Sequence, residues 1–70
     1  MPTAIQIADA RRSLHHQAVA AIAAAVRGGR SLRSIDNASG VSRQTLTNAV
    51  ERRSVLTRAN SEKILAALAG

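Results

Sequence analysis

Four polar residues with the chemistry to contact base pairs lie within one short segment. They are Arg43, Gln44, Thr47 and Asn48. A guanidinium can donate two hydrogen bonds to guanine O6 and N7, and the amides of Gln and Asn can pair with adenine N6 and N7. At helical spacing these four residues share one face, whereas Leu46, Ala49 and Val50 lie on the other. The segment predicts a helix with an apolar inner face and a polar outer face that suits duplex DNA.

Metal binding and catalysis are not expected from the remaining reactive side chains. His15 and His16 are adjacent, and neighbouring residues of a helix point about 100° apart, so they cannot share one ion. The chain has no Cys, which excludes disulfides, thiolate metal sites and cysteine nucleophiles and favours a cytoplasmic protein. A short aliphatic bundle offers no enclosed catalytic pocket. We therefore expect no enzyme activity, no cofactor and no small-molecule ligand.

The charge and composition favour duplex DNA over other polyanions. Ten Lys and Arg against four Asp and Glu give a net charge of +6, and nine of the ten cations are Arg. The absence of Phe, Trp and Tyr removes the stacking platforms on which many single-strand binders hold bases. The longest apolar run, Ala18 to Val26, has about half the length needed to cross a bilayer, so no membrane segment is expected.

Seventy residues allow one small domain, and its first element is an Ala-rich helix. Thr3 and Gln6 have capping-box spacing, and nothing breaks the chain before Gly28 and Gly29. One long helix of about 25 residues follows, with an apolar stripe at three- and four-residue steps. The stripe comprises Ile7, Ala10, Leu14, Ala18, Ala21 and Ala25, with Ile22 and Val26 beside it. The alternative is a break near Arg11 to Ser13, with residues 1–12 forming an extension or arm.

Three further helices are predicted from cap residues. Ser31, Ser42 and Thr57 are suited to N-caps, and Gly40 can end the second helix with a positive φ. Residues 51–56 have no clear period and are expected to form a loop whose apolar tip folds back on the core. The last helix extends from about residue 58 to 68, with Ile64, Leu65 and Leu68 facing inward. The predicted fold is an all-α bundle of four or five helices.

Residues 31–51 have the pattern of a helix-turn-helix: two short helices, a tight turn at Gly40, and an exposed polar face on the second helix. Ile35, Val41, Leu46 and Val50 are expected to form the apolar wedge between the helices. The segment 40–50 resembles the lambda-repressor-like helix-turn-helix domains of the Cro and CI type, and especially the LacI-type headpiece. Residues 56–68 resemble the helix that follows in that family, so the resemblance covers about residues 31–68.

Two positions depart from the family pattern. Asp36 stands where the family usually has Ala, and Ser39 stands where a small apolar residue is commoner. A buried unpaired carboxylate is costly. Asp36 should therefore point outward toward Arg33, or the two helices should meet at a different angle.

The resemblance implies that Arg43 and Gln44, and one turn later Thr47 and Asn48, contact base edges. Six further residues are expected to bind phosphates through hydroxyl groups, helix starts or positive charge. They are Ser31, Arg33, Ser42, Thr45, Arg52 and Arg53.

The expected function is sequence-specific binding of double-stranded DNA by a small transcriptional repressor, acting as a homodimer on a palindromic operator. A phage or plasmid regulator of this kind is what the resemblance implies. Self-association is expected through the N-terminal half of the first helix, where Ile5 and Ile7 extend past the compact domain. The alternatives are an architectural or excisionase-like DNA binder and, in a different class, a basic helical module for a protein partner or a membrane surface.

Overall fold

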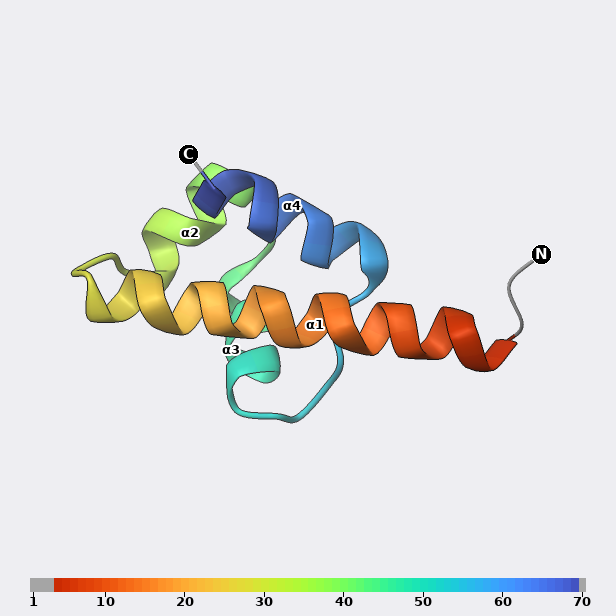
Figure 1. Ribbon diagram of the computed structural model, residues 1–70. Coiled ribbons are helices and arrows are strands. Elements are labelled where there is room, and N and C mark those ends of the chain that lie inside the picture. The colour runs from red at the N-terminus through yellow and green to blue at the C-terminus, as the bar shows by residue number, and fades with distance from the viewer. Residues whose placement is uncertain (1–3, 70) are drawn as a thin grey trace.

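The computed structural model describes the backbone of residues 4–69 and the side chains of residues 10–69. Within that range it contains four α-helices and no strand, which confirms the all-α prediction (Figure 1). The helices are α1 (Ala4–Arg27), α2 (Leu32–Ser39), α3 (Arg43–Val50) and α4 (Arg58–Ala69).

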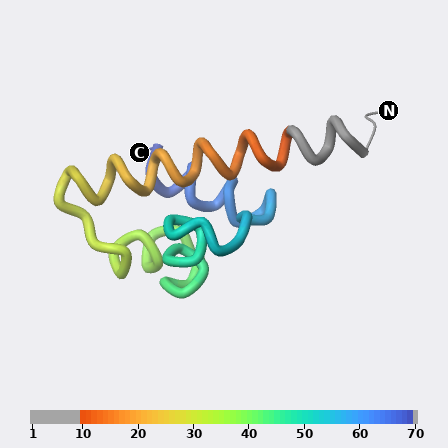
Figure 2. The backbone as a smooth tube through the Cα atoms, turned by 90° about the horizontal axis from the view of Figure 1, so that it is seen from below, coloured from red at the N-terminus to blue at the C-terminus, as the bar shows by residue number. Residues whose placement is uncertain are grey.

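Helix α1 is continuous through Arg11 and Ser13, so the predicted long helix is confirmed and the alternative of a break there is wrong. The other three helices gather on one side of α1, and α1 continues beyond them toward its N-terminal end (Figures 1 and 2). The predicted cap formed by Thr3 and Gln6, and the side chains of Ile5 and Ile7, lie outside the described residues.

A glycine turn ends α1 as the sequence predicts. Gly29 has φ +101°, which an L side chain rarely adopts. Its N–H donates to the Val26 carbonyl at 3.0 Å, and the Arg30 N–H donates to the Ala25 carbonyl at 3.0 Å. This pair of bonds is the Schellman motif, which satisfies carbonyls that a helix end would otherwise leave open.

The core is small and entirely aliphatic, with all four helices contributing to it. Its buried members are Ala18, Ile22, Ile35, Val41, Leu46, Ala49, Leu56 and Ile64. Val19, Ala25, Leu32, Leu65 and Leu68 pack against this cluster while partly exposed. The inward face predicted for α4 is therefore confirmed.

Three apolar residues do not occupy the places that their spacing suggested. Val50 was expected in the wedge between α2 and α3, but 41% of it is exposed, and Ala49 is fully buried in its place. Adjacent helical residues point about 100° apart, so only one of this pair can face α1. Val26 is 45% exposed for the same reason, because Ala25 beside it packs on the core. Ala10, the third of these residues, is also exposed.

The predicted N-caps of the three shorter helices are confirmed. The Ser31 hydroxyl accepts from the Ser34 N–H at 3.1 Å, and the Ser42 hydroxyl accepts from the Thr45 N–H at 3.2 Å. The Thr57 hydroxyl accepts from the Asn60 N–H at 3.1 Å. Each bond satisfies one of the backbone donors that a helix start leaves unpaired.

The loop between α3 and α4 folds back on the core through one residue. Leu56 is buried, whereas Val55 beside it is 49% exposed. Two side chains of α1 hold the Leu56 backbone: His15 Nδ1 accepts from its N–H at 3.1 Å, and Arg11 Nε donates to its carbonyl at 3.3 Å. Helix α1 therefore fixes the loop as well as covering the core.

Candidate nucleic-acid interface

The turn between α2 and α3 is closed by Gly40 and Ser39. Gly40 has φ +77°, and its N–H donates to the Asp36 carbonyl at 2.8 Å. The Ser39 hydroxyl donates to the Ile35 carbonyl at 2.7 Å and accepts from the Val41 N–H at 3.2 Å. Ser39 thus ties the end of α2 to the start of the turn, which gives a polar residue at this position a structural reason.

The start of α3 is exposed and rigidly capped. In addition to the backbone bond from Thr45, the Ser42 and Thr45 hydroxyl oxygens lie 2.9 Å apart and share a hydrogen bond. Arg43 and Gln44, the first two residues of α3, are exposed. The partial positive charge of the unpaired N–H groups at this helix end adds to the charge of Arg43.

Helices α2 and α3 together form a hollow, here called the α2–α3 hollow. Its lining residues are Ser31, Leu32, Arg33, Asp36, Arg43, Gln44 and Thr47. It brings together two of the six predicted phosphate-binding residues and three of the four predicted base-reading residues. Five of the ten residues predicted to contact DNA therefore line one hollow.

Asn48 is connected to this surface through Gln44. The Gln44 Nε2 donates to the Asn48 Oδ1 at 3.2 Å, one helical turn away. Asn48 is half-buried, as is Thr47. The bond orders the Gln44 side chain along α3 and leaves its amide oxygen available to a further donor.

Asp36 is half-buried and lines the α2–α3 hollow with Arg33, so it points outward. This is one of the two arrangements expected from the sequence. No ion pair joins it to Arg33 among the described residues, where the ion pairs are Arg53 with Glu51 and Arg58 with Glu62. Asp36 thus adds a negative charge to an otherwise basic surface.

Arg30 is a residue of this region that sequence reasoning missed. Its guanidinium donates to the Ser34 hydroxyl oxygen through Nε at 3.3 Å and Nη2 at 3.1 Å. It therefore places a positive charge beside the start of α2, next to Ser31. The available signal was the four-residue spacing of an Arg and a Ser across a predicted N-cap.

Arg52 and Arg53 lie apart from the α2–α3 hollow, beyond the opposite end of α3. Eight helical residues separate them from the start of α3, a distance of roughly 12 Å. Arg53 Nε lies 3.2 Å from a carboxylate oxygen of Glu51, and both side chains are exposed. The predicted phosphate-binding residues are therefore divided between the two ends of α3.

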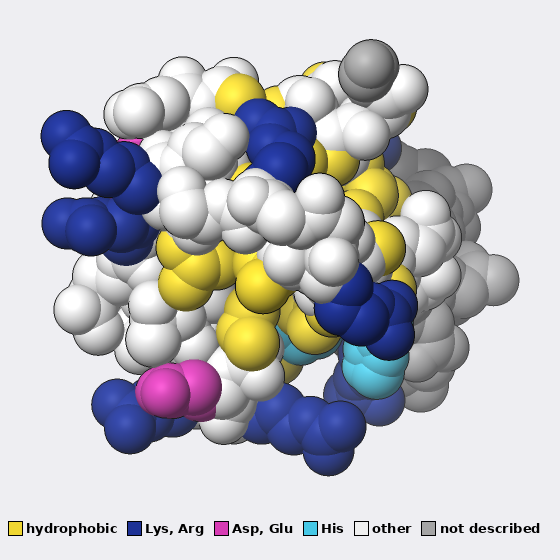
Figure 3. All heavy atoms as spheres, turned by 90° about the vertical axis from the view of Figure 1, so that its left-hand side faces the viewer, with side chains coloured by type: hydrophobic (Ala, Val, Ile, Leu, Met, Phe, Trp, Pro, Cys, Tyr) yellow, Lys and Arg dark blue, Asp and Glu magenta, His cyan; other side chains and the backbone are white. Residues whose placement is uncertain are grey.

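Positive charge surrounds an apolar area on one face of the molecule. Figure 3 shows hydrophobic side chains near the centre of this face and Lys and Arg side chains around its edge. Val26 and Val50 are two of the three large hydrophobic residues that the described part of the chain leaves exposed; the third is Val55.

Comparisons with protein-family models, curated proteins and solved structures give no match to this chain. In the part that the structure describes, no helix combines the length and hydropathy needed to span a membrane. The same part holds no cluster of three or more His, Cys, Asp or Glu side chains suited to a metal ion. The two histidine rings meet edge to face, with centroids 5.5 Å apart.

Proposed function

We propose that the protein binds double-stranded DNA through α2, the turn at residues 40–42, and α3, used as a helix-turn-helix. One observation carries the proposal: the α2–α3 hollow joins Ser31 and Arg33 to Arg43, Gln44 and Thr47 at the exposed start of α3. Hydroxyl groups and cations suited to phosphates thus flank side chains suited to base edges. The net charge of +6 supports attraction to a polyanion.

Within this proposal the protein is a small transcriptional repressor of the cytoplasm that blocks a promoter as a homodimer. One α3 offers only four side chains for base contacts, which is few for useful specificity. Two copies related by a two-fold axis would read an inverted repeat, with half-sites about 34 Å, one duplex turn, or a multiple of it apart. The operator is therefore proposed to be palindromic.

The test begins with selection of bound sequences from random duplexes, followed by titration of the selected and a scrambled duplex at several salt concentrations. Affinity should fall steeply with salt, because each neutralised phosphate releases about 0.9 counterions. Gln44→Ala should cost roughly 1–3 kcal/mol per half-site on the selected duplex and leave the scrambled duplex nearly unaffected. Arg43→Ala should weaken binding to the selected duplex by a similar amount, and it should also reduce the dependence of affinity on salt concentration.

Gln17→Ala is the matched control, because Gln17 is an exposed glutamine of α1 outside the α2–α3 hollow. It should leave both affinities unchanged. If Gln44→Ala and Arg43→Ala discriminated the two duplexes as well as the parent does, the start of α3 would not read bases. Binding that did not depend on salt would contradict DNA binding through phosphates.

A further inference from the structure

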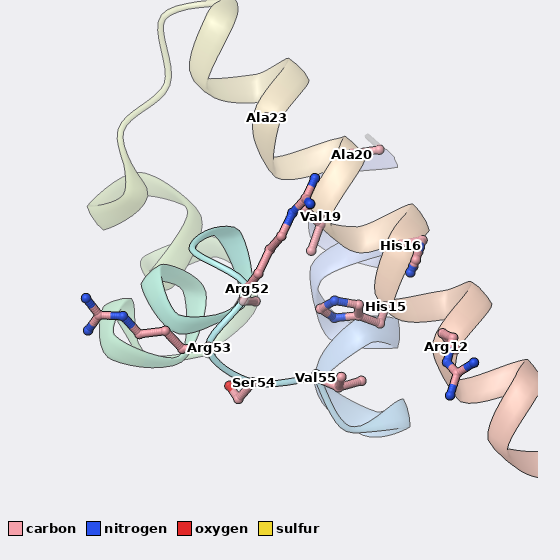
Figure 4. A pocket seen from close by; sticks show the side chains of 11 residues that line it. Arg12, His15, His16, Val19, Ala20, Ala23, Arg52, Arg53, Ser54 and Val55 are labelled. Atoms are coloured by element: carbon pink, nitrogen blue, oxygen red, sulfur yellow. The ribbon is translucent and has the colours of Figure 1, made fainter.

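A second hollow, with a volume near 630 Å³, lies between α1 and the loop that follows α3. We call it the α1–loop hollow. One wall is α1, with Arg12, His15, His16, Val19, Ala20 and Ala23, and the other is formed by Ala49 and residues 52–55 (Figure 4). It does not share a lining residue with the α2–α3 hollow. Its volume falls within the range of about 300–1,000 Å³ that is typical of small-molecule sites.

The lining combines an apolar surface with positive charge. Val19, Ala20, Ala23 and Val55 supply aliphatic surface, whereas the only ionisable lining residues are arginines and histidines. No Asp or Glu lines the hollow among the described residues. The charged oxygens of a phosphate group do not cover aliphatic surface, so the combination favours an organic anion with an apolar body.

Arg52 is the residue that gives this hollow a defined anion partner. Its φ of +63° makes it the one non-glycine residue with a positive φ in the described part of the chain. The Arg52 N–H donates to Ala49 at 3.2 Å and the Arg53 N–H donates to Asn48 at 2.8 Å, the same Schellman pattern that Gly29 completes after α1. Glycine is the residue suited to this position, and sparsely populated backbone conformations cluster at functional sites.

The side-chain directions distinguish Arg52 from its neighbour. Figure 4 shows the Arg52 side chain reaching from the loop toward α1 near Val19, while the Arg53 side chain points away from α1. Arg53 also pairs with Glu51, whereas the ion pairs of the described residues do not include Arg52. The left-handed backbone at residue 52 therefore accompanies a guanidinium directed across the hollow.

We propose that the α1–loop hollow binds small organic anions, with a carboxylate held by the Arg52 guanidinium and an apolar body resting on Val19, Ala20 and Ala23. Arg12 and His16 stand at the α1 side of the same hollow and contribute further hydrogen-bond donors. The site uses no residue of the α2–α3 hollow, so it is independent of the proposed base-reading surface.

The experiment is a titration of the ¹⁵N-labelled full chain at pH 7, without DNA, with sodium hexanoate, 1-hexanol and sodium acetate. Hexanoate has both the charge and the apolar body, and each of the other probes has only one of them. Amide shifts should be confined to residues 12–23 of α1 and 49–55. Hexanoate should bind about threefold to fivefold more tightly than hexanol, the effect expected of one exposed ion pair, and acetate more weakly still.

Three variants identify the site. Arg52→Gly keeps the left-handed turn, since glycine accepts it, and should weaken hexanoate binding about threefold to fivefold while leaving hexanol binding unchanged. Ala23→Leu should reduce binding of both probes by filling the hollow. Lys63→Ala, which also removes one positive charge but from an exposed position on α4, should leave both affinities unchanged.

Equal affinity for hexanoate and hexanol, equal loss in the Arg52 and Lys63 variants, or amide shifts spread over the whole chain would each overturn the proposal. So would the absence of saturable shifts with hexanoate. None of these outcomes bears on DNA binding, because no duplex is present in the titration.

Discussion

Arg52 holds a backbone conformation that costs an L residue stability. Left-handed helical geometry destabilises a non-glycine residue by about 1–2 kcal/mol. Substitution by glycine removes this cost, but part of the gain in stability is lost because glycine increases the entropy of the unfolded chain. We expect Arg52→Gly to raise the free energy of unfolding by about 0.5–1 kcal/mol, measured by urea denaturation. Arg53→Gly is the control. Arg53 does not have a positive φ, so Arg53→Gly should be less stable than the parent. A destabilised Arg52→Gly together with a stabilised Arg53→Gly would contradict a backbone cost at Arg52.

Ser61 is the only buried polar residue of the described chain, and its hydroxyl has no hydrogen-bond partner among the described residues. An unsatisfied buried polar group costs about 1–3 kcal/mol. Ser61→Ala should therefore raise the free energy of unfolding by about 1–2 kcal/mol, seen as a higher midpoint in thermal or urea unfolding. Ser13→Ala, at an exposed helical position, gains the same helix propensity and loses only the 3.4 Å bond that its hydroxyl accepts from exposed Gln17, so it should give less than half of that increase.

Asp36 places a negative charge beside two arginines of the proposed DNA-binding surface. Removing it by Asp36→Ala should raise affinity for any duplex about threefold at low salt, the effect of one charge near a phosphate across water. Titration of a scrambled duplex measures this effect. Glu62→Ala makes the same change of charge on α4 and should have little effect. Weaker binding by Asp36→Ala would mean instead that the carboxylate accepts a hydrogen bond from a base amine such as cytosine N4.

At the scale of elements, the loop after α3 depends on the neutral form of one histidine. Partial burial of His15, together with the positive charges of His16 and Arg11, lowers its pKa below the ordinary value of 6.5. The bond from the Leu56 N–H requires a lone pair on His15 Nδ1, which protonation removes. Arg11 and His16 are the charged groups of α1 beside His15. Arg12, Arg52 and Arg53 line the same hollow as His15.

The folded protein therefore binds this proton less readily than the unfolded chain does. Stability should be complete above pH 6.5 and should decline as pH falls from 6.5 toward the lowered pKa of His15. Urea denaturation between pH 7.5 and 5.5 measures the decline. His15→Gln should abolish most of it, and His16→Gln, which leaves the bond to Leu56 in place, should retain it. A decline of equal size in His15→Gln would assign the effect to other groups.

Local signals in the sequence were sufficient to predict the helices. Ser31, Ser42 and Thr57 cap the helices they were expected to cap, because an N-cap is decided by residues three or four positions apart. The exposed start of α3 with Arg43 and Gln44 was predictable for the same reason. The choice of Ala49 over Val50 as the buried residue was not, because it depends on how closely α1 approaches α3.

Contacts between distant parts of the chain also could not be predicted from the sequence. His15 and Arg11 bind Leu56 across more than forty residues, and no spacing rule predicts such a pair. The left-handed conformation of Arg52 was hidden because glycine, its usual signal, is absent. The α1–loop hollow depends on both the contact of α1 with Leu56 and the left-handed backbone of Arg52. The sequence pattern therefore does not predict a ligand site there.

At the scale of the whole molecule, α1 is longer than the bundle requires and continues past α4 (Figure 1). We expect this extension to carry self-association, since the sequence places Ile5 and Ile7 on it and the aliphatic core is thin. Removal of residues 1–10 should lower the mass found by analytical ultracentrifugation more than it lowers helicity by circular dichroism. The shortened chain keeps Arg11 and therefore the contact with Leu56.

An unchanged mass after this truncation would contradict the prediction. It would assign any dimer to another surface, such as α4 around Leu65 and Leu68 or the exposed Val26 and Val50. A monomeric parent would equally exclude the proposed palindromic reading by a stable dimer.

The attachment of Leu56 to α1 also has a consequence for local opening. Most protected amides of a helical protein exchange with solvent when a helix unwinds, but the Leu56 amide is held by an imidazole and lies between helices. Its hydrogen exchange therefore reports separation of the loop from α1 while every helix stays intact. Since that loop joins the end of α3 to α4, the exchange rate of this single amide measures how often the connection between these two helices separates from α1.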